Sequence, residues 1–218
     1  MAKTTTALFD LDGTLIDSTE AILESFAFAF DFFGAPKPDE KTIVRLIGSP
    51  LAKMFADLGV SEEQKQSYID RYKERYGDVC LQKTFLLPNV EEALKTLKPI
   101  AKIGVVTTKS AVFSKKILTH LGVKSYIDEV IGFEDAKNPK PNAEPILFAL
   151  NRLGSPRENA FMIGDTPIDI NAAINAKITP IGVLCGYSSA EVLAPYNCAV
   201  YTDALEAAKA IAALSNSK

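Results

Sequence analysis

Short apolar segments rich in β-branched residues alternate with segments of helical periodicity over most of this chain of 218 residues. The strand-like segments are 4–9, 102–106, 126–131, 160–163 and 180–184, and the helical ones are 90–98, 111–121, 143–153, 168–176 and 204–214. Strands and helices that alternate over short connections are typical of a parallel sheet covered by helices on both faces. The sequence therefore predicts an α/β fold with a five-stranded parallel sheet at its core.

One long region interrupts this alternation with helical patterns alone. Between the first two strand-like segments, helical periodicity is found at 18–33, 41–46, 51–58 and 62–76, and Gly- or Pro-containing breakers separate these patterns. A crossover between two parallel strands needs one helix, so the additional helices are expected to form a separate unit. We predict an inserted α-helical domain at 16–83, a core domain made of 1–15 and 84–218, and hinges at 15–17 and 84–88.

The segment 26–30 within this region has two interpretations. Phe and Ala alternate there with a period of two, as in a half-buried strand. Ile22, Phe26 and Phe30 also share one face of a helix, and the Ala content and the length of the run favour that alternative. We expect a helix whose aromatic stripe packs against neighbouring helices.

The charge balance disfavours nucleic acid as the main partner. The chain has 24 Lys and Arg against 27 Asp and Glu, a net charge of -3, and no run of basic residues longer than two. A nucleic-acid-binding domain usually carries a basic excess or stripe. The N-terminus lacks the apolar stretch of a secretory signal, no run approaches the ~18 apolar residues of a membrane span, and the three cysteines are scattered. We expect a cytoplasmic protein, monomeric or homodimeric, with neither a nucleic-acid nor a membrane partner.

Two carboxylates follow the first predicted strand. Asp10 and Asp12 are separated by one residue, so at a strand end they point to the same side, and Gly13 follows them. Open α/β sheets bind their ligands at this carboxyl edge. Two acids there suit a divalent cation with oxygen ligands, or a nucleophile beside a general acid. A solvated strand end followed by a glycine turn is the alternative.

A second acidic pair follows the fourth predicted strand. Gly164 and Asp165 come at the end of that strand, and Asp169 follows on the first turn of the next helix. Together with the first pair, these residues would form a dense anionic cluster, which is costly unless a cation lies within it. Unrelated helix caps and turn acids would explain each pair alone, but they explain less well why both pairs stand at strand ends.

Two hydroxyls and one lysine are candidate anion-binding groups. Thr107 and Thr108 stand at the end of the second predicted strand, just before a helix whose N-terminal amides also favour an anion. Lys140 lies between Pro139 and Pro141, which stiffen the loop and limit the entropy lost in holding the amine. A cluster of helix-capping hydroxyls and an exposed loop lysine are the alternatives.

These segments, in this order, resemble the four motifs of the haloacid dehalogenase superfamily, and the resemblance extends over essentially the whole chain. The segment 10–14 is similar to the first motif, Thr107 to the second, Lys140 to the third, and Asp165 with Asp169 to the fourth. The resemblance implies a Rossmann-like core with a helical cap. The nearest likeness is the phosphoglycolate phosphatase-like group, which also includes pyrophosphatases, nucleotidases and phosphosugar enzymes.

The resemblance also implies roles for the acidic residues. Asp10 would be the nucleophile that forms an aspartyl-phosphate. Asp12 would protonate the leaving oxygen and then activate water. Mg²⁺ would be bound by Asp10, Asp165, Asp169 and the backbone carbonyl of Asp12. Because dehalogenases attack carbon and do not need the second acid of the first motif, Asp12 favours chemistry at phosphorus.

Further substrate contacts are implied in two places. The phosphoryl oxygens would be held by Thr107, Thr108 and Lys140. The leaving group would meet a cap loop at 46–51 that contains Gly48 and Ser49, and Arg45 would contact an anionic leaving group. An ordinary turn between two helices is the alternative for this loop. Thr108 stands where this group often has Asn, so we expect altered affinity without loss of activity.

Several functions are compatible with these residues. The leading hypothesis is a Mg²⁺-dependent phosphatase acting on phosphoglycolate, pyrophosphate, a nucleotide or a sugar phosphate. A phosphomutase of the β-phosphoglucomutase type would use an acid/base group of the cap, often His, whereas the only histidine, His120, ends a predicted core helix. A non-catalytic phosphometabolite-binding protein would not need Asp12. A phospho-receiver domain would be shorter and would lack the helical insert.

Overall fold

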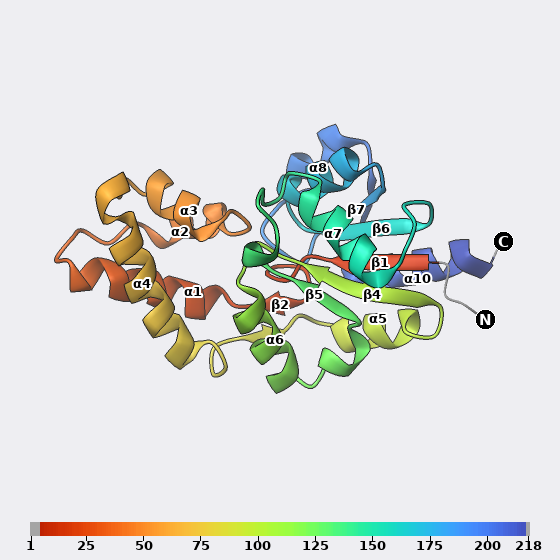
Figure 1. The fold of residues 1–218 in the computed structure, drawn as a ribbon, viewed down its shortest axis with the longest axis horizontal. Coiled ribbons are helices and arrows are strands. Elements are labelled where there is room, and N and C mark those ends of the chain that lie inside the picture. The colour runs from red at the N-terminus through yellow and green to blue at the C-terminus, as the bar shows by residue number, and fades with distance from the viewer. Residues whose placement is uncertain (1–4, 217–218) are drawn as a thin grey trace.

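The computed structural model describes residues 5–216, which form an α/β core with a lobe of helices at one end (Figure 1). The core contains a six-stranded sheet in the order β5–β4–β1–β6–β7–β8, in which all neighbouring strands are parallel. Its strands are β1 (Thr5–Phe9), β4 (Ala101–Val106), β5 (Glu129–Ile131), β6 (Ala160–Gly164), β7 (Thr179–Val183) and β8 (Ala199–Tyr201). The predicted α/β class with a parallel sheet is confirmed.

The sheet has one strand more than the five predicted. β8 is three residues long and only partly buried, so it lacks the continuous apolar run that marks a buried parallel strand. The predicted strand at 126–131 is also shorter, because a 3₁₀ turn takes up Lys124–Tyr126 and only Glu129–Ile131 pairs with β4. Thr4, the first residue of the predicted strand 4–9, lies outside the described residues.

Alternate side chains of the strands fill the two faces of the sheet. In β1, Ala7 and Phe9 belong to the apolar cluster on one face, whereas Leu8 belongs to the cluster on the other. One face is covered by α5 (Val90–Leu97), α6 (Ala111–His120) and α10 (Ala204–Asn216), and the other by α7 (Glu144–Leu153) and α8 (Pro167–Ala176) (Figure 1). A short helix, α9 (Ala190–Leu193), precedes β8. Apolar side chains therefore point to both faces of the sheet, which is why its buried strands appear as largely apolar segments in the sequence.

Most of the residues between β1 and β4 form the helical lobe. It contains α1 (Thr19–Phe32), α2 (Glu40–Leu46), α3 (Leu51–Asp57) and α4 (Glu62–Val79). The segment 26–30 is helical, as predicted. The ring of Phe26 in α1 lies 4.7 Å from the ring of Phe55 in α3 and 4.9 Å from that of Tyr72 in α4, measured between centroids. Aromatic packing of this kind holds the three helices together.

A second sheet of two strands joins the lobe to the core. β2 (Ile16–Asp17) and β3 (Phe85–Leu86) pair antiparallel, with Ile16 opposite Leu86. Two residues are too few to produce a recognisable alternation, so neither strand could be predicted from the hydrophobic pattern. Both chain crossings between lobe and core lie side by side in this ladder.

The strand order determines where ligands can bind. From β1 the chain builds β4 and β5 on one side and then returns to build β6, β7 and β8 on the other. A reversal of this kind opens a crevice at the carboxyl ends of the strands, which is where open α/β sheets bind ligands. The segments that follow β1, β4 and β6 therefore meet at the edge of the sheet that faces the lobe (Figure 1).

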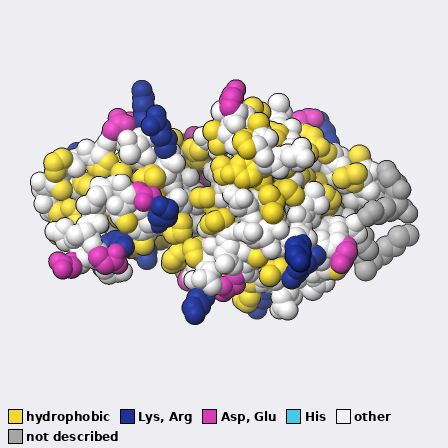
Figure 2. All heavy atoms as spheres, turned by 90° about the horizontal axis from the view of Figure 1, so that it is seen from above, with side chains coloured by type: hydrophobic (Ala, Val, Ile, Leu, Met, Phe, Trp, Pro, Cys, Tyr) yellow, Lys and Arg dark blue, Asp and Glu magenta, His cyan; other side chains and the backbone are white. Residues whose placement is uncertain are grey.

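The surface carries mixed charges and some apolar side chains. On the face in Figure 2, Lys and Arg side chains stand apart from one another over both the lobe and the core. Phe148 of α7 and Ile174 of α8 are exposed apolar side chains of the core, at 39% and 47%. Within residues 5–216, no helix combines the length and the apolar character needed to cross a membrane.

We predict that Phe26→Ala lowers the free energy of unfolding by about 3–5 kcal/mol, because the fully buried ring would leave a cavity between three helices. Phe32→Ala is the matched control, since this Phe of the same helix is 58% exposed, and it should cost less than about 1 kcal/mol. Urea denaturation monitored by circular dichroism measures both. Equal costs for the two variants would contradict the packing of Phe26 between α1, α3 and α4.

Candidate functional site

Three aspartates meet at the edge of the sheet that faces the lobe. Asp10 follows β1, Asp165 follows β6, and Asp169 lies in the first turn of α8. Each offers a carboxylate oxygen, and these three oxygens lie within 4.8 Å of one another. The three residues are at most 3% exposed. The structure thus brings together three of the four acids that the sequence placed at strand ends, and we call them the acidic cluster.

The Lys140 amine lies within the acidic cluster. Its Nζ donates to Asp10 Oδ1 at 2.7 Å, to Asp169 Oδ1 at 2.6 Å and to the backbone carbonyl of Val106 at 2.7 Å. Burial acts to lower the pKa of this amine, but the charges of Asp10 and Asp169 outweigh burial and raise the pKa above its usual value. Lys140 therefore remains a cation at neutral pH, with all three of its N–H donors in use.

Asp165 is the member of the cluster with no cationic partner among the described residues. Its carboxylate accepts hydrogen bonds from Thr14 Oγ1 at 3.0 Å and from the backbone N–H of Tyr187 at 2.8 Å. Burial and, to a smaller extent, the charge of Asp169 raise the pKa of Asp165 to about 7. Without a cation beside it, this carboxyl group therefore holds its proton more readily than an exposed aspartate does.

The pKa of Asp10 is also raised, well above its usual value. Burial is the largest cause and the charge of Asp169 is the next, while Lys140 acts in the opposite direction. Three carboxylates around one ammonium group, out of contact with water, leave an excess of negative charge. A cation that prefers oxygen ligands would neutralise it, so these residues fit a divalent metal ion such as Mg²⁺.

Two glycines allow the backbone to approach Asp165 closely. A Cβ at Gly13 would lie 2.4 Å from Asp165 Oδ2, and a Cβ at Gly186 would lie 2.1 Å from the same atom. Gly13 also has a φ of +84°, a conformation that strains other residues. The glycine that follows Asp12 in the sequence therefore gives room to a carboxylate from a distant strand.

Asp12 is held separately from the acidic cluster. Its Oδ1 accepts a hydrogen bond from Ser18 Oγ, and its Oδ2 lies 3.3 Å from Lys109 Nζ. Lys109 Nζ also donates to the Tyr76 hydroxyl of α4 at 2.7 Å. One oxygen of Asp12 is thus fixed by the residue before α1, and the other is linked through an ammonium group to the lobe.

Lys109 is a site residue that the sequence analysis did not single out. Its side chain is 10% exposed and contacts Asp12 and Tyr76, which come from distant parts of the chain. Its one local signal was its position directly after the two threonines at the end of β4. A lysine at this position is commonly an exposed surface residue, so only its contacts in the folded chain identify Lys109 as part of the candidate site.

The two threonines at the end of β4 have different contacts. Thr107 is buried, and its Oγ1 accepts from the backbone N–H of Lys109 at 3.1 Å. Thr108 Oγ1 instead donates to the backbone carbonyl of Gly48 at 2.9 Å. A hydroxyl has one hydrogen, so in this arrangement the Thr108 hydroxyl binds the lobe and cannot donate to a phosphoryl oxygen.

The loop between α2 and α3 reaches the core. Gly48 has a φ of +98°, and a Cβ there would lie 3.4 Å from Thr166 Cγ2 in the core. Gly48 and Ser49 both line a cavity between lobe and core, whereas Arg45 is exposed on α2 and does not line it. Two of the three lobe residues named from the sequence therefore line this cavity, and Arg45 does not.

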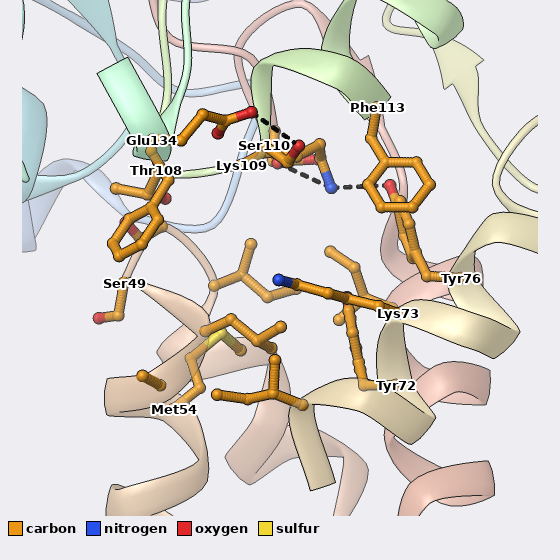
Figure 3. Close-up of a pocket in the computed structure, with 18 of the residues that line it drawn as sticks. Ser49, Met54, Tyr72, Lys73, Tyr76, Thr108, Lys109, Ser110, Phe113 and Glu134 are labelled. Atoms are coloured by element: carbon orange, nitrogen blue, oxygen red, sulfur yellow. Dashed lines mark hydrogen bonds and ion pairs between the residues drawn. The ribbon is translucent and has the colours of Figure 1, made fainter. Parts of the chain in front are cut away.

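That cavity has a volume of about 480 Å³ and lies between the lobe and the end of β4 (Figure 3). Asp12, Thr108 and Lys109 line its core side, and residues of α1, α3 and α4 line its lobe side. In Figure 3, Lys73 extends into it from the lobe. Asp12 lines the cavity, whereas the three aspartates of the acidic cluster do not. A small molecule that contacts both Asp12 and the acidic cluster would therefore extend into the cavity with the part that touches neither.

Comparisons with known proteins show to which family this chain belongs. The model of a family described as haloacid dehalogenase-like hydrolase matches residues 7–183. A pyrophosphatase PpaX from Bacillus velezensis is 32% identical over 199 residues, covering 89% of this chain and 89% of that protein. A phosphoglycolate phosphatase from Salmonella typhi is 30% identical over 210 residues, covering 85% of this chain and 83% of that protein.

A solved structure agrees with these matches. A hydrolase of the haloacid dehalogenase-like family from Streptococcus pneumoniae superposes with a TM-score of 0.85 at 28% sequence identity, covering 96% of this chain and 99% of that one. The family match spans the segments that carry Asp10, Thr107, Lys140 and Asp165. The chain therefore belongs to the haloacid dehalogenase-like hydrolases, as its four motifs had indicated.

Proposed function

We propose that this protein is a Mg²⁺-dependent phosphatase that hydrolyses the phosphate monoester of a small metabolite through an aspartyl-phosphate on Asp10. The observation that carries the proposal is the contact of Asp10 with Lys140 inside a buried acidic cluster, beside a cavity lined by Asp12. The names of the relatives, a pyrophosphatase and a phosphoglycolate phosphatase, support this class of reaction.

Asp10, Asp165 and Asp169 would hold Mg²⁺, together with the backbone carbonyl of Asp12 that the family resemblance adds. The geometry of the acidic cluster supports a cation at this place, because three buried carboxylates have only the ammonium group of Lys140 beside them. When bound, the ion would supply positive charge that offsets the repulsion between a carboxylate and a phosphate dianion.

Asp10 would act as the nucleophile. One carboxylate oxygen would form a bond to phosphorus while the bond from phosphorus to the leaving oxygen breaks, so that the phosphoryl group moves to the side chain. Lys140 Nζ, 2.7 Å from Asp10 Oδ1, orients the carboxylate and brings positive charge to the phosphoryl oxygens. Thr107, buried beside them, has a hydroxyl hydrogen available for one of these oxygens.

Asp12 would transfer the protons of both half-reactions. It would first donate a proton to the leaving oxygen, and the free alcohol would depart. It would then take a proton from the water that attacks phosphorus, which releases inorganic phosphate and regenerates the Asp10 carboxylate. Ser18 and Lys109 hold the Asp12 carboxylate at the cavity wall, where a leaving oxygen would be within reach.

We infer that the lobe, residues 16–83, is a cap domain that closes over the core. Two hydrogen bonds support this role, from Thr108 to the carbonyl of Gly48 and from Lys109 to the hydroxyl of Tyr76. The β2–β3 ladder carries both chain crossings, which suits a hinge. Closure of the cap would exclude bulk water from the reacting groups.

Water is the phosphoryl acceptor that the site favours. A phosphomutase would use a second acid/base group supplied by the cap. None of the described residues that line the cavity is a histidine, and His120 is exposed at the C-terminal end of α6. Hydrolysis needs no acid/base group besides Asp12.

The first test is phosphate release from a panel of phosphate monoesters with Mg²⁺ or with a chelator. We predict Mg²⁺-dependent turnover that falls by at least about 1000-fold in Asp10→Asn, because the amide cannot act as the nucleophile. The variant should stay folded, since it removes one charge from an over-charged cluster. Asp57→Asn, an exposed lobe position, is the control and should keep full activity. Turnover by folded Asp10→Asn would contradict the mechanism.

Metal binding should depend on pH. The raised pKa of Asp165 contributes stability to the metal-free protein that is fully present below about pH 4, the unfolded value, and is lost as pH rises through about 7. Because Mg²⁺ needs the carboxylate, we predict that a fixed Mg²⁺ concentration raises the melting temperature more at pH 8 than at pH 5.5. In Asp165→Asn the Mg²⁺ effect should disappear at both pH values. Equal Mg²⁺ effects at the two pH values in the wild type would argue against this site.

The Thr108 contact should favour the closed cap. Thr108→Val keeps the shape of the side chain but loses the hydrogen bond to Gly48, and a bond of this kind contributes about 0.5–1.5 kcal/mol. We predict a decrease in kcat/KM of roughly 2- to 10-fold, whereas Thr108→Ser should retain the wild-type value. Steady-state kinetics with any turned-over substrate decides this. A Ser variant as impaired as the Val variant would mean that the hydroxyl is not the group that matters.

A further inference from the structure

The cavity between lobe and core points to the chemistry of the leaving group. It is about 480 Å³, within the range of about 300–1,000 Å³ usual for small-molecule sites. Asp12, which faces the leaving oxygen under the proposed function, forms part of its wall. The part of a substrate beyond that oxygen must therefore lie in this cavity, and the cavity walls can be compared with the candidate leaving groups.

We propose that the substrate is a phosphate monoester whose leaving group is a bulky, predominantly apolar ring system that carries a hydrogen-bond acceptor or an anionic group. This inference rests on the proposed phosphatase function and names its substrate class. It disfavours the small, highly charged leaving groups of phosphoglycolate and pyrophosphate.

The walls of the cavity are mainly apolar. Ile22 of α1, Met54 of α3 and Ile69 of α4 line it from the lobe, and Phe113 and Phe133 line it from the core. The first three are at most 8% exposed, so their place in the wall is set by the packing of the lobe. A leaving group that fills this space would remove apolar surface from water on both sides.

Tyrosine rings complete the wall near Asp12. Tyr72 and Tyr76 stack at 5.6 Å between ring centroids, and the ring of Phe113 meets Tyr76 edge-on at 5.2 Å (Figure 3). Burial raises the pKa of both tyrosine hydroxyls, so both stay uncharged at neutral pH. The wall next to the reacting groups is therefore aromatic and neutral, which suits a ring better than a second phosphate.

Most charged groups at the cavity already have partners. Lys109 contacts Asp12 and Tyr76, and the carboxylate of Glu134 accepts from Ser110 Oγ at 3.1 Å and from the backbone N–H of Ala111 at 3.0 Å. These pairs neutralise one another or cap a helix. They leave little positive charge for an anionic leaving group of small size.

Lys73 is different. No described residue forms an ion pair or a hydrogen bond with its amine, and the side chain extends from α4 into the cavity (Figure 3). It lies on the lobe side, across the cavity from Ser110 (Figure 3). An acceptor or anionic group on the leaving group would meet this amine, whose residue is exposed on α4.

The test compares phosphate esters of primary alcohols, because their leaving groups have similar acidity and differ mainly in size. Ethyl, cyclohexylmethyl, benzyl and 2-naphthylmethyl phosphate are assayed with Mg²⁺ beside phosphoglycolate, pyrophosphate and adenosine monophosphate. We expect kcat/KM to be at least roughly 30-fold higher for benzyl than for ethyl phosphate, given the apolar area that each additional carbon buries. Comparison of adenosine monophosphate with the aryl-containing esters shows whether the enzyme prefers a nucleoside or a simple aryl alcohol as the leaving group.

Two pairs of variants test which residues of the cavity wall cause the preference for particular leaving groups. Phe133→Ala should reduce the ratio of kcat/KM for 2-naphthylmethyl over ethyl phosphate by at least about fivefold. Phe148→Ala, on α7 away from the cavity, should leave that ratio unchanged. Lys73→Met should abolish a preference of about threefold for 4-carboxybenzyl over benzyl phosphate. Lys65→Met, on the same helix but outside the cavity, should preserve it.

The outcomes separate this inference from the proposed function. Higher kcat/KM for phosphoglycolate or pyrophosphate than for the ring-containing esters would overturn the inference while the phosphatase function stands. Equal kcat/KM values for the ethyl, cyclohexylmethyl, benzyl and 2-naphthylmethyl esters would overturn the inference as well. So would equal effects of Phe133→Ala and Phe148→Ala. Absence of Asp10-dependent phosphate release from every compound would instead overturn the proposed function.

Discussion

The organisation of this molecule depends on three carboxylates and one ammonium group held together out of contact with water. Asp10, Asp165 and Asp169 place oxygens within 4.8 Å of one another, and Lys140 reaches two of them. Like charges at this separation repel strongly in a protein interior, so such an arrangement persists only where the surrounding fold enforces it. Neighbouring parallel strands, β1 and β6, end at the same edge and provide that enforcement.

The lobe and the core make different contributions. The core supplies charge, through residues that follow β1, β4 and β6. The lobe supplies apolar walls and hydrogen bonds to the core, such as those at Thr108 and Lys109. Tyr76 belongs to both parts, since its ring lines the cavity and its hydroxyl accepts from Lys109. Under the proposed function, the reacting groups would come from the core and the lobe would contact the leaving group.

Local signals were sufficient to predict much of the core. Acids, glycines and apolar strands follow one another directly in the sequence around Asp10 and around Asp165, so the cluster could be predicted from spacing and from the common edge of a parallel sheet. Strands of two or three residues, such as β2, β3 and β8, show no period and were missed.

Contacts between distant segments could not be predicted in the same way. The link from Asp12 through Lys109 to Tyr76 joins three segments that only the folded chain brings together. Thr108 was expected near a phosphoryl group, but its hydroxyl hydrogen is directed to the lobe. Arg45 lies in the last turn of α2 and is exposed. The cavity is lined instead by the loop that follows this helix.

The proposed phosphorylation of Asp10 is tested most directly by the stereochemical course of the reaction at phosphorus. A turned-over substrate would be prepared with a chiral thiophosphate group and hydrolysed in isotopically labelled water, and the configuration of the released thiophosphate would be determined. Two successive in-line displacements, first by Asp10 and then by water, predict retention of configuration. Inversion would mean that water attacks the substrate directly, and it would contradict a phosphorylated Asp10.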